Sequence, residues 1–433
     1  MKNANRASSR LQIGNHATGA LGYEPALSVW LCVILSGLMG VGVLTAADRE
    51  PPLIFINTSF ENACPLYWET DDAGVIHISL VYDQERGSPN RANGHWFFEL
   101  QAKPDAPLTI VLHNLENIYN GRKSSPGKDG CLSFVSEDGK VWRPVRAETT
   151  ADHGFKFTLV THTGSLYLAR LQPYRLSDLQ DLLKRIRLSP LVEITKIGET
   201  VEGRDLEIVR VGNADAPHCV LLRGRAHPWE AGGSWAIQGL IDRLLRADAD
   251  AARYLKRYCV YIMPMANKDG VVRGRTRFNQ LGADLNRKWD KPADPVVAPE
   301  NAALEGWLTT MVGQGKAPNL VIDLHNDSSG QLHVTRLDIG LEKYLKRMDV
   351  FEAMLRKHTW FTEGSTRSGY RTGTIEEGLV ERFRIDACVL ELNDTWIAGL
   401  DDTPSAEHWE LFGAQLAEAL YHYFAATGQS ENP

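Results

Sequence analysis

The pattern of hydrophobic residues changes once along the 433 residues of the chain, near residue 172. Before this point, short runs such as "GVIHISLVY" and "FKFTLVTH" alternate apolar and polar residues between turn-rich stretches such as "DQERGSPNRANG". This alternation is typical of strands with one buried face. After it, apolar runs such as "HCVLLRG" alternate with helical patterns, which indicates a sheet covered on both faces. We therefore expect a β-sandwich over residues 48–172 and an α/β domain over residues 173–433.

The N-terminal 47 residues read as a targeting segment. Lys2, Arg6 and Arg10 precede residues 26–47, a run that contains no charged side chain and ends in small residues. A basic start, an apolar centre and a small-residue end are typical of a secretory signal peptide. The run is also long enough to span a bilayer if it is retained. We therefore expect a signal peptide or an N-terminal membrane anchor, and an exported protein, periplasmic or secreted, that contacts a membrane only through a retained anchor.

Charge and cysteine content exclude two classes of function. The formal net charge is −7, and the chain has no dense run of Lys or Arg, so its charge does not favour a nucleic-acid partner. The chain has 6 cysteines. Five of them follow the targeting segment, and no two form a C-x-x-C pair. This pattern predicts neither a disulfide framework nor a zinc knuckle.

Two pairs of histidine and glutamate have the spacing H-x-x-E. His227 and Glu230 follow the apolar run "CVLLRG", whereas His113 and Glu116 lie inside a strand pattern. Such a pair can bind one Zn²⁺, but chance supplies about one pair per chain of this size. His325 ends another apolar run, and the ends of parallel strands meet at one edge of an α/β sheet. The sequence therefore predicts a hydrolytic zinc site made by His227, Glu230 and His325, with the fourth position left for water.

Three further residues carry charge that such a site needs. Glu391 lies in the apolar run "ACVLEL", where a carboxylate is costly unless it has a role or a partner. It is our candidate for the general base. Arg277 and Arg287 lie in "RGRTRFNQLGADLNRKW", and the fork of an arginine can bind a carboxylate or an oxyanion.

These pieces together resemble the zinc metallocarboxypeptidases of the carboxypeptidase A type. The matching motifs are "HPWE", "NKDGVVRGRTR", "GADLNRKW", "VIDLH" and "VLELND", which occur in the order of the family between residues 175 and 424. The stretches "NLENIYNG" and "SEDGKVWRPV" are similar to the cytosolic carboxypeptidase branch, which carries a β-sandwich before its peptidase domain. The resemblance implies a mixed sheet flanked by helices, one zinc ion per chain, and peptide or protein C-termini as substrates. An exported location departs from a branch named for the cytosol.

The resemblance also implies a role for each motif residue. His227, Glu230 and His325 are the implied zinc ligands, and Glu391 is the implied general base. The other implied roles concern orientation and substrate: Asp284 orients the first histidine, Arg277 stabilises the oxyanion, Asn286 and Arg287 bind the terminal carboxylate of the substrate, and Tyr370 is the candidate for a tyrosine that closes over the substrate.

Substrate choice and two other functions remain open at this stage. The segment "YRTGTIEEGLVERFRID" before the catalytic strand contains both acidic and basic residues, so it does not decide which C-terminal residue is preferred. A zinc acylase of the aspartoacylase type shares motifs similar to "DLNR" and "VIDLHND". A non-catalytic protein that binds peptides or cell-wall fragments is the third alternative.

Overall fold

The computed structural model describes residues 51–124, 132–335, 341–368 and 373–428. The expected targeting segment, residues 1–47, lies outside these ranges. Within them, no helix combines the length and the apolar character needed to cross a membrane.

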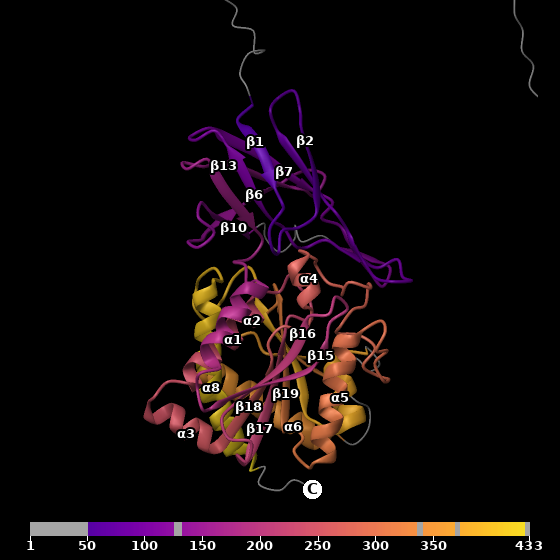
Figure 1. The fold of residues 1–433 in the computed structure, drawn as a ribbon, viewed down its shortest axis with the longest axis vertical. Coiled ribbons are helices and arrows are strands. Elements are labelled where there is room, and N and C mark those ends of the chain that lie inside the picture. Colours follow the sequence, from indigo (N-terminus) through magenta and orange to yellow (C-terminus); the bar gives the residue numbers. More distant parts are fainter. Residues whose placement is uncertain (1–50, 125–131, 336–340, 369–372, 429–433) are drawn as a thin grey trace, which may run out of the picture. The chain divides into compact units, whose positions relative to one another are not determined.

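The N-terminal part is a pair of packed five-stranded sheets (Figure 1). The first sheet, in spatial order, contains β1 (Leu53–Asn57), β6 (Phe97–Ala102), β14 (Ser165–Ala169), β10 (Leu132–Ser136) and β11 (Arg143–Arg146). The second contains β12 (Glu148–Thr149), β13 (Phe155–Val160), β7 (Pro107–His113), β3 (Ile76–Leu80) and β2 (Leu66–Thr70). Alternate residues, among them Phe98, Ile110 and Leu168, are fully buried in one core between the sheets. The period of two in the sequence therefore corresponds to a sandwich, as expected.

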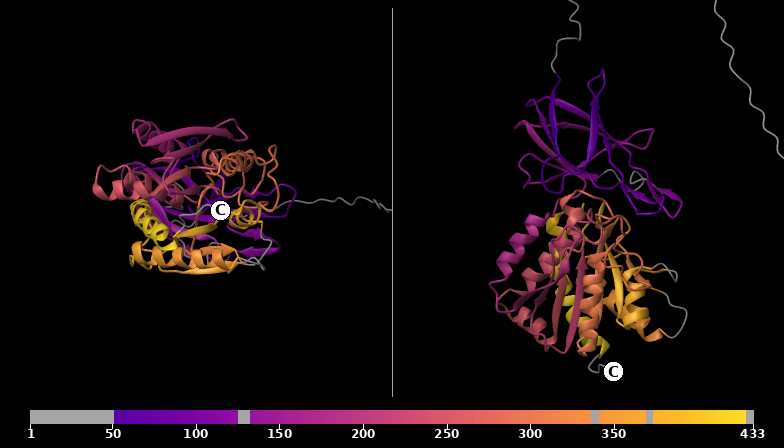
Figure 2. Two further views of the ribbon diagram at one scale, coloured as in Figure 1. Left: turned by 90° about the horizontal axis from the view of Figure 1, so that it is seen from below. Right: turned by 45° about the vertical axis from the view of Figure 1, so that its right-hand side comes forward.

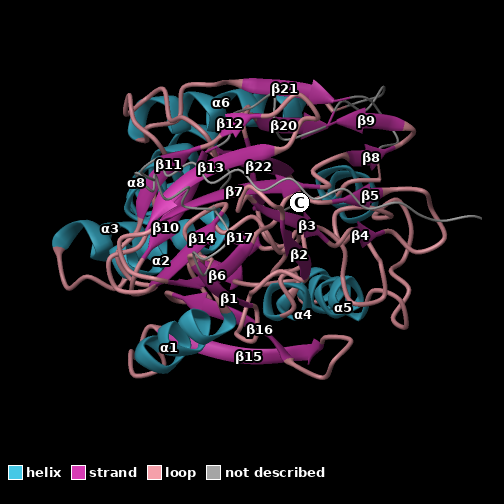
Figure 3. Ribbon diagram, turned by 90° about the horizontal axis from the view of Figure 1, so that it is seen from above, coloured by secondary structure: helices cyan, strands magenta, loops and turns pink. Residues whose placement is uncertain are grey.

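A small four-stranded sheet extends from the sandwich and has no clear signal in the sequence. It contains β4 (Asp83–Gln84), β5 (Arg91–Ala92), β8 (Asn117–Tyr119) and β9 (Arg122–Ser124). Figure 3 shows the four strands in a row. The strands are two or three residues long, too short for a detectable alternation. The sheet matters because two of its residues, Asp83 and Tyr119, contact the candidate site described below.

The C-terminal part is built on one eight-stranded mixed sheet, which confirms the expected α/β class. In spatial order its strands are β15 (Val192–Glu199), β16 (Asp205–Val211), β18 (Tyr258–Met263), β17 (His218–Gly224), β19 (Leu320–Asp327), β22 (Ala387–Asn393), β20 (Leu332–Thr335) and β21 (Ser365–Ser368). The four central strands β18, β17, β19 and β22 are parallel. They are mostly apolar and almost fully buried, because helices lie on both sides of the sheet (Figures 1 and 2).

The helices include one tightly packed pair that fixes the position of the site. The helices are α1 (Leu176–Ile186), α2 (Gly232–Leu244), α3 (Ala249–Arg257), α4 (Lys268–Val272), α5 (Pro299–Gly313), α6 (Glu342–His358), α7 (Ile375–Gly378), the π-helical turn η3 (Leu379–Phe383) and α8 (Ala406–Thr427). Where α2 crosses α8, a Cβ on Gly239 would lie 2.0 Å from the Glu410 carbonyl oxygen, and one on Gly413 would lie 1.8 Å from that of Ala236. Only glycine permits this approach, so the backbones of α2 and α8 lie in direct contact.

The segment between the two parts is packed rather than loose. The Tyr174 ring is buried and meets the Trp235 ring edge-on at 4.8 Å, and the Trp235 indole donates to the Gln172 carbonyl. Its helix α1 begins at Leu176 with Arg175 as N-cap and Asp178 in the capping box. Contacts group residues 51–433 into one compact unit, so the division at residue 172 stays a prediction.

Candidate active site

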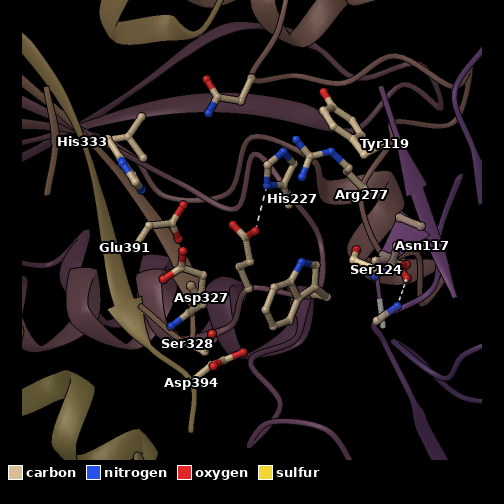
Figure 4. A pocket seen from close by; sticks show the side chains of 18 of the residues that line it. Asn117, Tyr119, Ser124, His227, Arg277, Asp327, Ser328, His333, Glu391 and Asp394 are labelled. Carbon is tan, nitrogen blue, oxygen red and sulfur yellow. Dashed lines mark hydrogen bonds and ion pairs between the residues drawn. The ribbon is translucent and has the colours of Figure 1, made fainter. Parts of the chain in front are cut away.

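Three buried side chains converge where β17 and β19 end. His227 and Glu230 lie on the connection from β17 to α2, and His325 lies on β19. The Nδ1 atom of His227 is 2.8 Å from Glu230 Oε1, the Nδ1 atom of His325 is 2.7 Å from Glu230 Oε2, and the two Nδ1 atoms are 3.2 Å apart. Figure 4 shows the His227–Glu230 contact. The structure therefore brings together all three residues that the sequence predicts as zinc ligands.

Asn326 joins β19, which carries His325, to the start of α2 and to β22. Its Oδ1 accepts a hydrogen bond of 2.8 Å from the backbone of Gly232 at the start of α2, and its Nδ2 donates one of 2.8 Å to the Leu392 carbonyl on β22. A Cβ on Gly232 would lie 2.5 Å from Asn326 Nδ2, so glycine is required here. Because Asn326 follows His325 directly, the bonds hold the start of α2, β19 and β22 together at this edge.

Each histidine is held from behind by a carboxylate. His227 Nε2 is 3.2 Å from Asp284 Oδ1, and His325 Nε2 is 2.7 Å from Asp323 Oδ2. Asp323 also accepts bonds of 2.7 and 2.6 Å from Arg223, and both of these side chains are fully buried. A carboxylate behind the ring fixes its orientation and directs the other nitrogen forward, which is the usual arrangement around metal-bound histidine.

The donor set fits zinc. With Nε2 of each ring facing a carboxylate, the Nδ1 lone pairs of His227 and His325 point toward each other and toward Glu230. Two imidazole nitrogens and one carboxylate are the ligands of many catalytic zinc sites. Burial acts to raise the pKa of Glu230, but the two facing histidines outweigh this effect and the pKa falls to about 2. The carboxylate is therefore ionised, as a metal ligand must be.

Glu391 lies next to this trio. On the adjacent parallel strands it is directly paired with His325, so both side chains leave the sheet on the same face. Its Oε2 atom is buried and has no hydrogen-bond partner among the described residues, and burial raises the pKa of Glu391 well above its usual value. A carboxylate oxygen without a partner beside a metal site is suited to accept a proton from water.

Arg277 is joined to the trio through Asp284. Its Nε donates a bond of 2.7 Å to Asp284 Oδ2, and the Tyr119 hydroxyl donates one of 3.1 Å to the same oxygen. The guanidinium lies 4.7 Å from the centre of the Tyr119 ring (Figure 4). Its backbone N–H donates to Asp83 Oδ2 at 2.7 Å. Burial acts to lower the pKa of Arg277, but the Asp284 carboxylate outweighs it, so the side chain stays charged.

Asn286 and Arg287 lie on the same loop as Asp284. The Asn286 N–H donates to Asp284 Oδ1 at 3.0 Å, and its side-chain oxygen accepts a bond of 3.0 Å from the backbone of Ile375. The Arg287 guanidinium lies 5.3 Å from the centre of the Tyr119 ring and donates to the Asn286 carbonyl at 2.7 Å. The loop therefore places the side chains of Asn286 and Arg287 beside Arg277.

Several of the residues discussed above line one cavity. Its volume is about 550 Å³, and its lining includes His227, Glu230, Arg277, Arg287 and Glu391. Tyr370, the candidate for a closing tyrosine, lies outside the described residues. A cavity of this size accommodates a small ligand or the end of a chain.

Three contributing residues were missed by sequence reasoning. Asp323 precedes His325 by two positions on β19, so it faces the same side of the sheet, and this spacing is a signal that could have identified it. Asp83 and Tyr119 come from the small sheet, far away in sequence from Arg277 and Asp284. Nothing in the local pattern around either residue indicates this contact.

Comparison with known proteins identifies the same region. A family model described as zinc carboxypeptidase matches residues 179–332. Cytosolic carboxypeptidase 6 of Caenorhabditis elegans is 30% identical over 164 residues, which cover 36% of this chain and 36% of that protein. Cytosolic carboxypeptidase 1 of Gallus gallus is 32% identical over 244 residues, covering 50% of this chain and 19% of that protein. An uncharacterized protein of Zymomonas mobilis is 27% identical over 241 residues, which cover 55% of this chain and 60% of that protein. The chain thus spans less than two thirds of the length of each of these relatives.

The fold is shared over a longer stretch. The crystal structure of a metallo-carboxypeptidase from Burkholderia cenocepacia superimposes with a TM-score of 0.75 at 20% sequence identity, covering 86% of this chain and 99% of that one. A putative carboxypeptidase from Burkholderia mallei gives a TM-score of 0.73 at 21% identity, covering 87% of this chain and 98% of that one. At these identities the likeness establishes the fold, including the strand-rich part before the eight-stranded sheet.

One expectation is wrong. The apolar N-terminal run led us to expect an exported protein, periplasmic or secreted. The named relatives reported above are cytosolic carboxypeptidases, and this finding contradicts the exported location. The apolar run itself lies outside the described residues.

The family match, the named relatives and the shared fold agree with one another. Residues 179–332 carry a zinc carboxypeptidase domain, and the named relatives and the shared fold support a peptidase hydrolase.

Proposed function

We propose that this protein is a zinc-dependent carboxypeptidase that releases the C-terminal residue of a peptide, or cleaves a similar amide bond beside a free carboxylate. One observation carries the proposal. The predicted ligands His227, Glu230 and His325 converge on one point, and the partnerless oxygen of Glu391 lies on the same face of the sheet.

His227, Glu230 and His325 would hold the zinc ion. When bound, zinc supplies Lewis acidity, which acidifies water and polarises a carbonyl group. Glu391 accepts the proton of the attacking water and then donates it to the leaving amine. Its raised pKa favours this second step, because a carboxyl group that holds a proton readily can also return it.

Arg277 and Arg287 bind different negative charges of the substrate. Arg277 lies closer to the ligand histidine through Asp284, and there it stabilises the oxyanion that develops on the scissile carbonyl. Arg287 and Asn286 bind the terminal carboxylate, which is present before the reaction starts. Tyr119 contacts both guanidinium groups and keeps them on the same side of the cavity.

The partners that follow from this site are the C-termini of peptides or proteins. The names of the relatives support this class of substrate, since they describe carboxypeptidases. The net charge of −7 gives no support for a nucleic-acid partner.

The test is the release of C-terminal residues from a peptide library by the full chain, measured with a chelator, without it, and after zinc is restored. We expect release that the chelator stops and zinc restores, with C-terminally amidated peptides much poorer as substrates. Hydrolysis of N-acyl amino acids without any hydrolysis of peptides would instead favour the acylase alternative. Stoichiometric zinc without hydrolysis of either substrate would favour the binding-protein alternative.

A further inference from the structure

A second group of histidine and carboxylate side chains lies outside the catalytic cavity. His358 is the last residue of α6, and Glu418 and His422 lie one turn apart on α8. One ligand atom from each of the three lies within 4.8 Å of the other two. None of the three residues lines the catalytic cavity, and the proposed reaction does not use them. Two imidazoles and one carboxylate are nevertheless the donor types that zinc prefers.

The packing of α6 against α8 places these side chains together. Two turns before His358, the Phe351 ring meets the Tyr423 ring of α8 edge-on at 5.4 Å. Just after the end of α6, the backbone N–H of Trp360 donates a bond of 3.0 Å to the side-chain oxygen of Gln415 on α8. The end of α6 is therefore fixed against α8 on both sides of His358, and the three side chains do not meet by a loose surface contact.

The distances within the group suit ligands of one ion better than direct hydrogen bonds. The Nδ1 atom of His358 lies 3.7 Å from Glu418 Oε1, and the Nε2 atom of His422 lies 3.6 Å from the same oxygen. Both distances are too long for a hydrogen bond. Two atoms that each lie about 2.1 Å from a tetrahedral zinc ion are about 3.4 Å apart. A small rotation of the side chains is therefore enough to let all three bind one ion.

His358 is also in the right protonation state. Its side chain is 12% exposed, and burial, together with the neighbouring His422, lowers the pKa of His358. A neutral imidazole offers a nitrogen lone pair to a metal, whereas an imidazolium offers none. The Nε2 atom of His358 is buried without a hydrogen-bond partner, and its Nδ1 atom makes no hydrogen bond among the described residues. An ion at Nδ1 would supply one of these missing partners.

We propose that His358, Glu418 and His422 bind a second zinc ion, which fastens α8 to the end of α6. The side chains of Glu418 and His422 are 44% and 36% exposed, so the ion enters from solvent and water completes its coordination. Solvent weakens electrostatic attraction at such a position, so this site holds zinc less tightly than the buried catalytic site. The dialysed protein keeps the catalytic zinc alone and takes up the second ion when free zinc is supplied.

The test is a calorimetric titration of zinc into the dialysed full chain. We expect one further zinc per chain, and no binding of magnesium, which prefers oxygen ligands. His422→Ala should weaken the second site by at least about 10–100-fold, the loss caused by removing even a residue behind a ligand, and should leave hydrolysis unchanged. The matched control is His408→Ala on the same helix, whose ring faces the Thr403 carbonyl, and it should bind the second zinc normally.

Thermal unfolding gives a second readout that needs no catalysis. A ligand that binds only the folded chain raises its Tm. Free zinc should raise the Tm of the unaltered chain and of His227→Ala, and the rise should disappear when His422→Ala is added to either. Its survival in His227→Ala makes the second site independent of the proposed function.

Three results would overturn the proposal. The first is a titration in which the unaltered chain takes up no further zinc. The second is unchanged affinity in His422→Ala, or in Glu418→Gln if the first variant does not fold. The third is equal weakening in His408→Ala, which would assign the uptake to surface histidines in general.

Discussion

The two H-x-x-E pairs of this chain have the same spacing but opposite surroundings. In the sandwich, His113 Nε2 faces His77 Nδ1 at 2.9 Å, and Glu116 turns away to pair with Arg91 and Lys123. In the α/β part, His227 and Glu230 meet each other and His325 at one point.

Burial separates the two pairs more sharply than spacing does. His113 also has a carboxylate behind it, Asp152 at 3.4 Å, but the two side chains are 27% and 65% exposed. The side chains of His227 and Asp284 are 4% and 0% exposed. Water satisfies polar groups at the surface, whereas buried donors need partners inside the protein. A metal site is thus recognised by a third ligand and by buried orienting carboxylates, both supplied by distant parts of the chain.

The largest expected effect tests the difference between the two H-x-x-E pairs directly. His227→Ala removes one of three ligands from a buried site and should abolish both zinc binding and hydrolysis. The matched variant His113→Ala removes a histidine at the surface and should leave both within error of the unaltered chain, with a change in unfolding free energy of about 1 kcal/mol or less. Elemental analysis and a peptide assay on each variant check this. Equal loss of zinc from the two variants would show that the wrong pair was chosen.

A smaller effect is expected where charge develops only during the reaction. Arg277→Ala removes the cation beside the oxyanion, so kcat should fall by about 10²–10³-fold while KM changes little. Steady-state kinetics on one good peptide give both constants. A rise in KM at constant kcat would assign Arg277 to substrate binding instead.

Arg287→Ala should change mainly KM, whereas Arg277→Ala should change mainly kcat. Its partner, the terminal carboxylate, is charged before the reaction starts, so its loss weakens binding in general. We expect KM for free C-termini to rise by about 10–100-fold and the preference over the amidated peptide to disappear. Measuring the peptide and its amide side by side checks this. An unchanged preference would place the carboxylate contact elsewhere.

The smallest expected effect comes from the sandwich side of the site. Tyr119→Phe keeps the ring under Arg277 and removes the hydrogen bond to Asp284, which orients His227. The loss of a single bond to such a carboxylate should reduce kcat by about 10-fold. Tyr67→Phe, at an exposed position of β2, is the control and should change nothing. No difference between the two variants would mean that the small sheet only covers the site.

The sequence was sufficient for the features that depend on local pattern. The period of two and the apolar strands predict both architectures, and the ends of β17 and β19 predict where His227 and His325 meet. The carboxylate inside an apolar run predicts Glu391, motif resemblance adds Asp284, and the structure brings both to the same edge. None of these assignments needs a contact between distant segments beyond the order of strands in a sheet.

The features that could not be predicted depend on long-range packing. The strands of the small sheet are too short to leave a periodic signal in the sequence. The contacts of Asp83 and Tyr119 with the loop that carries Arg277 and Asp284 are therefore visible only in the structure. The sequence did not show whether an acidic or a basic residue faces the substrate side chain, because the segment before β22 contains both. Only their burial and partners show that Glu376 faces the cavity while Arg382 and Arg384 do not.

The central claim is that three residues hold the metal and a fourth, Glu391, moves the proton. Glu391→Gln tests it most directly when zinc content and hydrolysis rate are measured on the same sample. Glutamine keeps the shape of the side chain but accepts no proton, and His227, Glu230 and His325 are untouched. The account predicts one zinc per chain, as in the unaltered protein, with a rate lower by about 10²–10⁴-fold. A near-normal rate with zinc bound, or loss of the zinc itself, would contradict it.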